Sequence, residues 1–326
     1  MKIIITGGVG YIGSHVVLAA LDHGHEVTVF DDLSTANKKN INLKTKFIKG
    51  SINSKKDLLK LFANDKYDAV IHLAASKASG ESMLNPKKYA QNNIIGSLNI
   101  LISCIDHGVK YFIFSSSAAV YGEPEHLPVT ELHPFNPVNP YGDTKAEVEK
   151  ILKSYEESCG LKYVSLRYFN ACGAHLDGTI GEMHDPETHL IPLVLQVASG
   201  RKKHISVFGD DYPTPDGTCV RDYVHVMDIV EAHILAMENL TITNKSQVFN
   251  IGNKKGFSVN QIIQMAKEIT KVDIPFKIQG RRKGDPAELI ADNKKIMNLL
   301  NWNPKYSELE TIVKSAWNWE KTLKIK

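Results

Sequence analysis

The sequence predicts an α/β protein with a doubly wound, Rossmann-like parallel sheet and a smaller, mixed α/β C-terminal domain. Short apolar runs alternate with helical patterns through the first half of the chain, and this alternation is typical of a parallel sheet with helices on both faces. A glycine-rich turn joins the first apolar run to the first helical pattern. After about Arg167 the pattern changes, because histidine, proline and glycine become frequent through Asp216. The 326 residues suit about two domains of roughly 150 residues each.

The expected strands and helices of residues 1–167 follow one another in order. Apolar runs predict strands at Lys2–Thr6, Val27–Asp31, Phe47–Lys49, Ala69–Leu73, Tyr111–Ser115 and Tyr163–Arg167. Helical periodicity predicts helices at Gly13–His23, Leu58–Phe62 and Asn92–Cys104. In a sheet of this type, ligands bind beyond the carboxyl ends of the strands.

The second half of the chain is expected to form a smaller, discontinuous domain over residues 168–326. Helical patterns at Met227–Glu238 and Val259–Thr270 precede a mostly helical tail that begins at Asp292. The apolar run Val248–Ile251 is expected to return to the first sheet, as a strand near residues 247–252. The first domain is therefore residues 1–167 together with this strand.

Composition and charge disfavour several classes of protein. The net charge of +3 is small and the basic residues are not interleaved with aromatic ones, so no nucleic-acid partner is expected. The four cysteines lie far apart, which predicts neither a disulfide framework nor a metal site. No run approaches the roughly 18 apolar residues of a membrane span, and the apolar start Ile3–Ile5 suits a buried strand better than a signal segment. A soluble, cytoplasmic protein is the expectation.

The glycine-rich turn is a candidate dinucleotide site. Gly7, Gly10 and Gly13 form G-x-x-G-x-x-G between a strand and a helix. Glycines there allow the backbone to approach a pyrophosphate, and the helix N-terminus favours its negative charge. Asp31 and Asp32 end the second strand, where a carboxylate accepts hydrogen bonds from a ribose hydroxyl and repels a 2′-phosphate. NAD is therefore expected rather than NADP.

Tyr141 and Lys145 are a candidate catalytic pair. They are four residues apart in the string N-P-Y-G-D-T-K and so can lie on one helix face. A lysine ammonium beside a phenol favours the phenolate and lowers the pKa of the tyrosine. Next to a nicotinamide, the phenolate can take a proton from an alcohol while hydride leaves the same carbon. The spacing alone is a weak signal, and the glycine turn in the same chain gives it weight.

The chain resembles the extended short-chain dehydrogenase/reductase superfamily in the strings T-G-G-V-G-Y-I-G, F-S-S-S-A-A-V-Y-G and Y-G-D-T-K. It resembles the UDP-glucose 4-epimerase family within it in L-R-Y-F-N from Leu166, D-Y-P-T-P-D-G-T-C-V-R-D-Y-V-H-V from Asp211 and R-R-K-G-D from Arg281. This resemblance covers nearly the whole chain. It implies that the first domain binds NAD and the second a UDP-hexose. It also implies a homodimer formed through the helices around Asn92–Cys104 and Tyr141–Tyr155.

The resemblance implies a catalytic set of Ser117, Tyr141 and Lys145. Ser117 would hydrogen-bond the reacting oxygen and Tyr141 would be the acid and base. Lys145 would hold the nicotinamide ribose and lower the tyrosine pKa. The implied contacts to NAD are made by Gly7, Gly10, Tyr11, Ile12, Gly13, Asp31, Asp32, Leu33, Ser34, Thr35, Ser51, Ile52, Leu73, Ala74, Ala75, Lys77, Asn92, Tyr141, Lys145 and Phe169.

The implied contacts to the UDP-hexose are made by Ser117, Tyr141, Asn170, His189, Leu190, Val207, Phe208, Arg221, Arg282, Asp285 and Leu289. Arginine guanidinium groups suit a diphosphate, and Phe208 would offer a flat wall to the uracil. Some positions depart from the common family pattern, because His189 stands where asparagine is common and Ser51 where an aspartate meets the adenine. Leu289 has intermediate bulk at a position thought to decide whether an N-acetyl group fits.

The implied reaction is a redox epimerisation at C4 of the sugar, in galactose and nucleotide-sugar metabolism. Tyr141 would remove the 4-hydroxyl proton while hydride passes to tightly bound NAD; the 4-keto sugar would turn over and take the hydride back on its other face. Nucleotide-sugar 4,6-dehydratases and UDP-glucuronate decarboxylases use acids or bases where this chain has Ala118 and Ala119, which disfavours both. UDP-N-acetylglucosamine 4-epimerisation, alone or as a dual activity, and UDP-glucuronate 4-epimerisation stay open. A non-catalytic NAD-sensing module is the remaining alternative.

Overall fold

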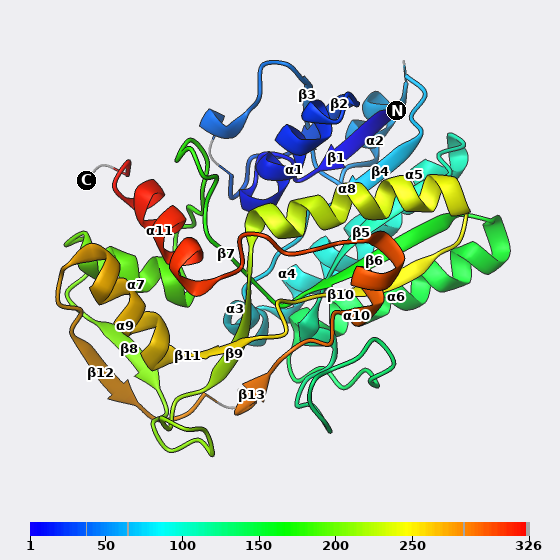
Figure 1. Cartoon of the computed structure of the whole chain (residues 1–326). Helices are drawn as coiled ribbons and strands as arrows, with labels where there is room; N and C mark the ends of the chain where they lie inside the picture. Colours follow the sequence, from blue (N-terminus) through cyan, green and yellow to red (C-terminus); the bar gives the residue numbers. More distant parts are fainter. Residues whose placement is uncertain (37, 64, 283, 324–326) are drawn as a thin grey trace.

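A parallel sheet with helices on both faces forms the larger part of the molecule (Figure 1). The computed structural model describes residues 1–36, 38–63, 65–282 and 284–323. Within these residues the sheet contains β1 (Lys2–Thr6), β2 (Glu26–Asp31), β3 (Lys46–Lys49), β4 (Ala69–His72), β5 (Tyr111–Ser117), β6 (Lys162–Tyr168) and β10 (Gln247–Ile251). The strands lie in the order β3-β2-β1-β4-β5-β6-β10, and every neighbouring pair is parallel. The winding reverses between β1 and β4, where ligands bind in folds of this kind.

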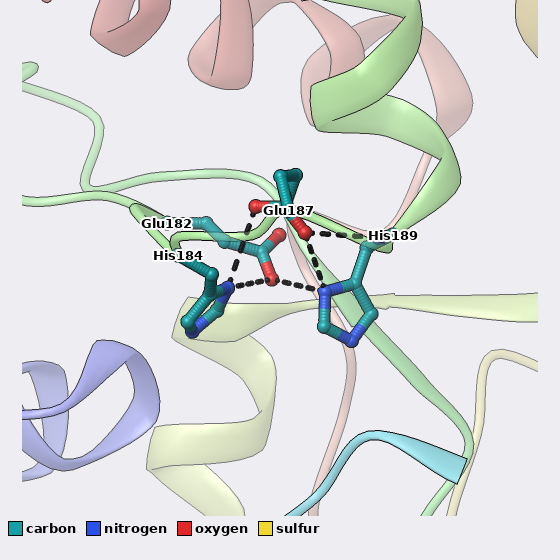
Figure 2. Close-up of side chains that lie close together, drawn as sticks. All are labelled: Glu182, His184, Glu187 and His189. Atoms are coloured by element: carbon teal, nitrogen blue, oxygen red, sulfur yellow. Dashed lines mark hydrogen bonds and ion pairs between the residues drawn. The ribbon is translucent and has the colours of Figure 1, made fainter. Parts of the chain in front are cut away.

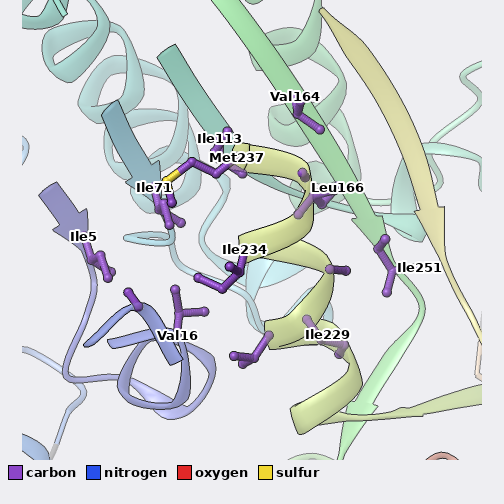
Figure 3. Packing of buried hydrophobic residues seen from close by; sticks show 14 of the residues in the cluster. Ile5, Val16, Ile71, Ile113, Val164, Leu166, Ile229, Ile234, Met237 and Ile251 are labelled. Atoms are coloured by element: carbon purple, nitrogen blue, oxygen red, sulfur yellow. The ribbon is translucent and has the colours of Figure 1, made fainter. Parts of the chain in front are cut away.

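One face of the sheet carries the largest hydrophobic cluster. Side chains alternate along a strand, so Ile3 and Ile5 of β1 share this face. Helices α1 (Tyr11–Asp22) and α8 (Val226–Thr243) cover it. In Figure 3, α8 lies across the strands with Met237 directed toward them. Both α8 and β10 come from the second half of the chain. Helix α8 packs on the first sheet, and β10 joins it as the expected returning strand, which is thereby confirmed.

The other face carries a second cluster that includes Ile4 of β1. Helices α2 (Lys55–Phe62), α5 (Gly96–Asp106) and α6 (Pro140–Cys159) cover this face. A sheet covered on both faces needs strands that are apolar throughout, which explains why the sequence presents them as continuous apolar runs.

The second half of the chain adds smaller sheets beside the first one (Figure 1). In the described part of the chain, one sheet contains β7 (Asn170–Cys172), β9 (Val220–His225), β11 (Gly256–Ser258) and β13 (Glu288–Leu289), and another pairs β8 (Ile205–Phe208) with β12 (Phe276–Gln279). Helices α7 (Leu190–Ala198), α9 (Val259–Thr270) and α11 (Leu309–Glu320) enclose a third cluster with β8 and β9. Helix α10 (Lys294–Leu300) packs against β10. The predicted α/β fold class is confirmed.

Some elements differ from the sequence prediction near the end of β5 and before α5. Strand β5 continues to Ser117, after which a 3₁₀ turn, η3 (Ala118–Val120), begins. The expected helix Asn92–Cys104 is a π-helical turn, η2 (Ala90–Ile95), followed by α5. Other short elements, absent from the prediction, are η1 (Lys38–Asn40), α3 (Ser79–Leu84) and α4 (Pro86–Tyr89).

All four cysteines are free. Across the residues that the structure describes, no helix has both the length and the apolar character needed to cross a membrane.

Candidate active site

The glycine turn between β1 and α1 is too tight for side chains. A Cβ on Gly13 would lie 2.1 Å from the Gly7 carbonyl oxygen, and one on Gly7 would lie 2.7 Å from the Ala74 amide nitrogen. Gly7 also has a φ of +72°, which L side chains rarely adopt. Gly10 is the N-cap of α1 and has no side chain to cap the helix, so an anion can approach the helix N-terminus. These features fit the pyrophosphate of NAD.

Asp31 holds the loops on both sides of the predicted adenosine site. Its carboxylate accepts hydrogen bonds from the Val9 amide at 3.0 Å and the Leu33 amide at 2.8 Å. Burial raises the pKa of Asp31, while these two amides oppose the rise. Asp32 is exposed, and its side chain accepts a hydrogen bond from the Ser34 amide at 2.9 Å. Both carboxylates therefore shape the end of β2 where a ribose is expected.

Asn93 ties the segment after β4 to α6. Its side chain accepts from the Ser76 amide at 2.8 Å and donates to the Ser76 carbonyl oxygen at 2.9 Å and the Thr144 hydroxyl at 3.0 Å. This arrangement fixes the segment that contains the predicted cofactor residues Leu73, Ala74, Ala75 and Lys77. The sequence pointed to the neighbouring Asn92, whose amide contacts the Ser76 hydroxyl at 3.4 Å. Asn93 lies in the π-helical turn, an irregularity that is frequent at functional sites but invisible to helical periodicity.

Ser51 and Ile52 follow β3 on the side of the expected adenine. The Ser51 hydroxyl accepts a hydrogen bond from the Asn53 amide at 3.3 Å. Ile52 is buried against α5, since a Cβ on Gly96 would lie 2.6 Å from the Ile52 Cδ1 atom. Ile52 therefore has a packing role in addition to its predicted cofactor contact.

Ser117, Tyr141 and Lys145 come from the carboxyl end of β5 and the first turns of α6. The Asn139 side chain caps α6, so Tyr141 and Lys145 occupy successive turns at its start. Lys145 is buried and donates to the Ser115 carbonyl oxygen at 2.7 Å. Its Nζ atom lies 5.8 Å from the centre of the Tyr141 ring. The predicted catalytic pair thus lies on one helix face beside the end of β5.

Burial dominates the titration of this pair. It raises the pKa of Tyr141, against a lowering by Ser117, and it lowers the pKa of Lys145 to about 7. The expected lowering of the tyrosine pKa is therefore wrong for the protein alone, because burial disfavours the phenolate and the Lys145 amine donates to the Ser115 carbonyl oxygen instead. A positive charge brought by an oxidised nicotinamide would act in the opposite direction and favour the phenolate.

A buried ion pair contacts β5, the strand that ends at Ser117. The guanidinium of Arg167 on β6 pairs with the carboxylate of Glu149 on α6 at 2.7 Å, and both side chains are 5% exposed. The Ser116 hydroxyl on β5 donates to the same carboxylate at 2.5 Å. Because three elements meet at one carboxylate, Glu149 fixes the orientation of α6 relative to β5.

A fourth hydrophobic cluster connects the residues after β5 with the second half of the chain. It contains Ala118, Ala146 and Phe169, and Leu289 packs against it. Ala118 and Ala146 directly follow Ser117 and Lys145 in sequence. Leu289 therefore packs close to the predicted reaction site.

Arg221 and Leu289 are opposite each other in the pairing of β9 with β13. The Arg221 guanidinium forms an ion pair with Asp285 and donates to the Val220 carbonyl oxygen at 2.7 Å. Asn170 begins β7 and pairs with Tyr223 of the same strand β9. The structure thus brings Asn170, Arg221, Asp285 and Leu289 to one sheet.

Val207 and Phe208 end strand β8. The Arg282 guanidinium lies 3.9 Å from the centre of the Phe208 ring, in a cation–π contact. The Phe208 ring is expected to contact the uracil, and one of its faces is therefore covered by Arg282, which is expected to bind the diphosphate. Lys283 of the same basic string lies outside the described residues.

His189 occupies the N-cap position of α7 without a capping hydrogen bond from its side chain, and Leu190 begins the helix. His189 also joins a cluster with Glu182, His184 and Glu187, which was not predicted and whose side chains converge in Figure 2. The sequence did contain a signal, since these residues form the pattern E-x-H-x-x-E-x-H.

A glycine turn at the switch point of a parallel sheet and a nearby serine–tyrosine–lysine set define a dinucleotide-dependent enzyme of the Rossmann-like class. The sequence matches the NAD dependent epimerase/dehydratase family over residues 3–252. The chain belongs to this family.

The most similar proteins include several UDP-glucose 4-epimerases. That of Halalkalibacterium halodurans is 49% identical over 98% of this chain and 96% of its own, and that of Lactobacillus helveticus is 46% identical over 99% and 98%. The solved structure of the Brucella ovis UDP-glucose 4-epimerase in complex with NAD has a TM-score of 0.94 and 42% identity, covering 97% of each chain. The Thermotoga maritima UDP-glucose 4-epimerase with UDP-glucose has a TM-score of 0.87 and 36% identity, covering 99% of this chain and 100% of its own. The UDP-Glc/GlcNAc 4-epimerase of Campylobacter jejuni has a TM-score of 0.87 and 43% identity over 99% of each chain.

Proposed function

We propose that this chain is an NAD-dependent 4-epimerase that interconverts UDP-galactose and UDP-glucose in galactose metabolism. The observation that carries the proposal is the convergence of Ser117, Tyr141 and Lys145 at the end of β5, in the same sheet as the glycine turn. Family membership and full-length relatives of this activity support it. Residues 1–167 with β10 bind NAD, and the remainder of residues 168–326 binds the nucleotide sugar.

Each of the three catalytic residues has a separate role that follows from its position. Tyr141 takes the proton of the sugar 4-hydroxyl and later returns one, while Ser117 hydrogen-bonds the same oxygen. Lys145 holds the nicotinamide ribose. NAD supplies the hydride acceptor and donor when bound. The glycine turn supports this assignment, because its closed geometry and uncapped helix N-terminus suit a pyrophosphate.

Ala118 and Ala119 favour epimerisation over elimination. A 4,6-dehydratase needs groups that move protons at C5 and C6 of the sugar, and a methyl side chain transfers none. The same residues disfavour decarboxylation of UDP-glucuronate. With only Ser117 and Tyr141 at the reacting oxygen, the 4-keto sugar can turn over and be reduced on its other face.

Binding of the UDP group keeps the 4-keto sugar in the active site between the two hydride transfers. Arg221 and Arg282 are the guanidinium groups placed to hold the diphosphate. Arg221 now pairs with Asp285, and Arg282 lies on Phe208. A diphosphate replaces these partners, so both arginines change contacts on binding.

Acceptance of N-acetylated sugars is the second candidate function. Leu289 is half-buried and packs in the cluster of Ala118 and Phe169, where its bulk limits the group at C2 of the sugar. The similarity to the Campylobacter jejuni enzyme favours this extension. UDP-glucuronate remains a further substrate alternative. A non-catalytic NAD sensor is disfavoured because the tyrosine and lysine are intact.

Incubation with UDP-galactose, UDP-N-acetylgalactosamine and UDP-glucuronate in turn tests the proposal. UDP-glucose should form from UDP-galactose. Absence of this interconversion by NAD-containing protein would refute the main activity. Conversion of the other two sugars decides between the narrower and broader substrate range.

We also place the protein in the cytoplasm as a homodimer. Free cysteines suit a reducing compartment. Apolar side chains are exposed on η2 and α5, the region around Asn92–Cys104 expected at the interface, with Ile95 at 45% and Ile102 at 42%, and exposed apolar patches mark association sites. Light scattering of the parent and of Ile102→Glu tests this region: the parent should be dimeric and the variant should dissociate. A monomeric parent would refute the dimer.

A further inference from the structure

Glu182, His184, Glu187 and His189 lie together in the segment between β7 and α7 (Figure 2). All four residues come from one stretch of eight residues that has no helix. Their ligand atoms lie within 4.8 Å of one another. The two imidazoles present their Nδ1 atoms to the two carboxylates.

The nitrogen–oxygen distances in the cluster are at or slightly below the spacing of neighbouring ligands in a tetrahedral ion site. His189 Nδ1 lies 2.8 Å from the Glu182 carboxylate and 2.9 Å from that of Glu187. His184 Nδ1 lies 3.1 Å and 3.4 Å from the same two groups. Zinc bonds of about 2.0–2.2 Å to nitrogen and oxygen place neighbouring tetrahedral ligands about 3.4 Å apart. Small outward shifts of the four groups would therefore admit an ion.

The carboxylates are buried and held in place by the backbone. The side chains of Glu182 and Glu187 are 5% and 4% exposed. Glu187 accepts hydrogen bonds from the amides of Thr188 at 2.7 Å and His189 at 2.8 Å. The Glu182 carbonyl oxygen accepts a hydrogen bond from the Trp319 indole at 2.8 Å. Such supporting contacts orient ligands and strengthen metal sites.

Charge favours a cation at this position. Two carboxylates taken out of water repel each other and need compensation. In the present arrangement the Lys77 amine lies 3.9 Å from the Glu182 carboxylate and 2.7 Å from the Nε2 atom of His184, and the imidazole Nδ1 atoms supply the remaining partners of the carboxylates. A divalent ion would neutralise both carboxylates at once.

We propose that Glu182, His184, Glu187 and His189 form a Zn²⁺ site. Two imidazole nitrogens and two carboxylate oxygens at tetrahedral spacing suit zinc. Four protein ligands close the coordination sphere, as in structural sites. The ion holds the segment that ends at His189 and Leu190, the residues assigned to the substrate pocket. It is therefore a structural clamp at the edge of the active site rather than a reactant.

A second cluster offers a matched control. Glu125, His126 and His133 also lie within ligand distance of one another. However, the Nε2 atom of His133 accepts from the Glu125 amide at 2.9 Å, and its Nδ1 atom lies 3.2 Å from the Pro134 carbonyl oxygen. Both nitrogens of His133 are therefore held by backbone groups, whereas the Nδ1 atoms of His184 and His189 face carboxylates. The cluster around His133 is expected to bind no zinc.

Zinc titration of full-length, chelator-treated protein tests the proposal. The parent and His126→Gln should each bind a single Zn²⁺ per chain by calorimetry and elemental analysis. Glu182→Gln and His184→Gln should lose affinity by more than the roughly 10- to 100-fold that removal of a supporting partner costs. Circular dichroism and retained NAD identify variants that are folded.

Substitution of Co²⁺ provides a second readout that does not depend on stability. Intense visible bands of tetrahedral cobalt should appear in the parent and be absent from folded Glu182→Gln protein. Failure of the parent to bind Zn²⁺ stoichiometrically would overturn the proposal and leave the cluster as an ion-pair network. Undiminished binding by both variants would also overturn it.

Discussion

Tyr141 lies half-buried at the start of α6, close enough to Ser117 for that hydroxyl to lower its pKa. Removal of its hydroxyl in Tyr141→Phe takes away the proton acceptor and leaves the packing intact. Loss of a general base typically costs about 10²–10⁴-fold in rate. We expect turnover of UDP-galactose to fall by this amount while the NAD content and melting temperature stay near those of the parent. Near-normal turnover of the variant would remove Tyr141 from its role.

Lys145 gives a pH-dependent prediction. Burial lowers its pKa from 10.5 to about 7. Between these values the unfolded chain binds more protons than the folded one, so stability rises with pH. Lys145→Met removes this dependence, and its stability relative to the parent should therefore fall by about 3 kcal/mol between about pH 6 and pH 9.

Urea denaturation of NAD-free protein at both pH values measures the effect of Lys145→Met. A relative stability that does not change with pH would contradict the lowered lysine pKa.

At the scale of elements, the turn between β1 and α1 has a strict requirement for glycine. Gly13→Ala places a Cβ 2.1 Å from the Gly7 carbonyl oxygen, and backbone on both sides prevents relief. We expect the variant to lose bound NAD and to melt at a lower temperature. Gly80→Ala in α3 is the control, because no heavy atom lies within 4 Å of its added Cβ. Retention of NAD by Gly13→Ala would contradict the assignment of this turn.

The junction of α6, β5 and β6 depends on Glu149. Glu149→Gln leaves Arg167 buried without its ionic partner, which typically costs about 3–5 kcal/mol. Glu147→Gln on the same helix breaks an exposed pair with Lys150, which should change stability by less than about 1 kcal/mol. Chemical denaturation of the two variants compares these costs. Equal effects of the two substitutions would contradict a supporting role for the buried pair.

The elements of the first sheet could be predicted because burial on both faces requires apolar strands. The strand that contains Val248–Ile251 was predicted to return to the sheet for the same reason. By contrast, β7 and β13 are only 3 and 2 residues long, too short to give a pattern. The π-helical turn at Ala90–Ile95 was not predicted, because its number of residues per turn differs from that of the α-helix expected there.

At the scale of the whole molecule, the site combines residues from the glycine turn to β13. The sequence motifs identified Ser117, Tyr141 and Lys145 as candidate catalytic residues, and the fold brings these residues together. Motifs did not reveal the burial that shifts the pKa values of Tyr141 and Lys145, nor the hydrogen bonds by which Asn93 supports the site. They also missed the cluster around His189: its four residues form a local pattern, but the burial of the two carboxylates and the contact of Lys77 with His184 depend on the fold.

The fate of the C4 hydrogen of the sugar tests the central claim most directly. UDP-galactose labelled with deuterium at C4 would be incubated with NAD-containing protein, and the product would be examined by NMR and mass spectrometry. Because hydride leaves C4 and returns to it, UDP-glucose should form with deuterium still at C4. UDP-glucose that carries protium at C4, or no UDP-glucose at all, would contradict the mechanism.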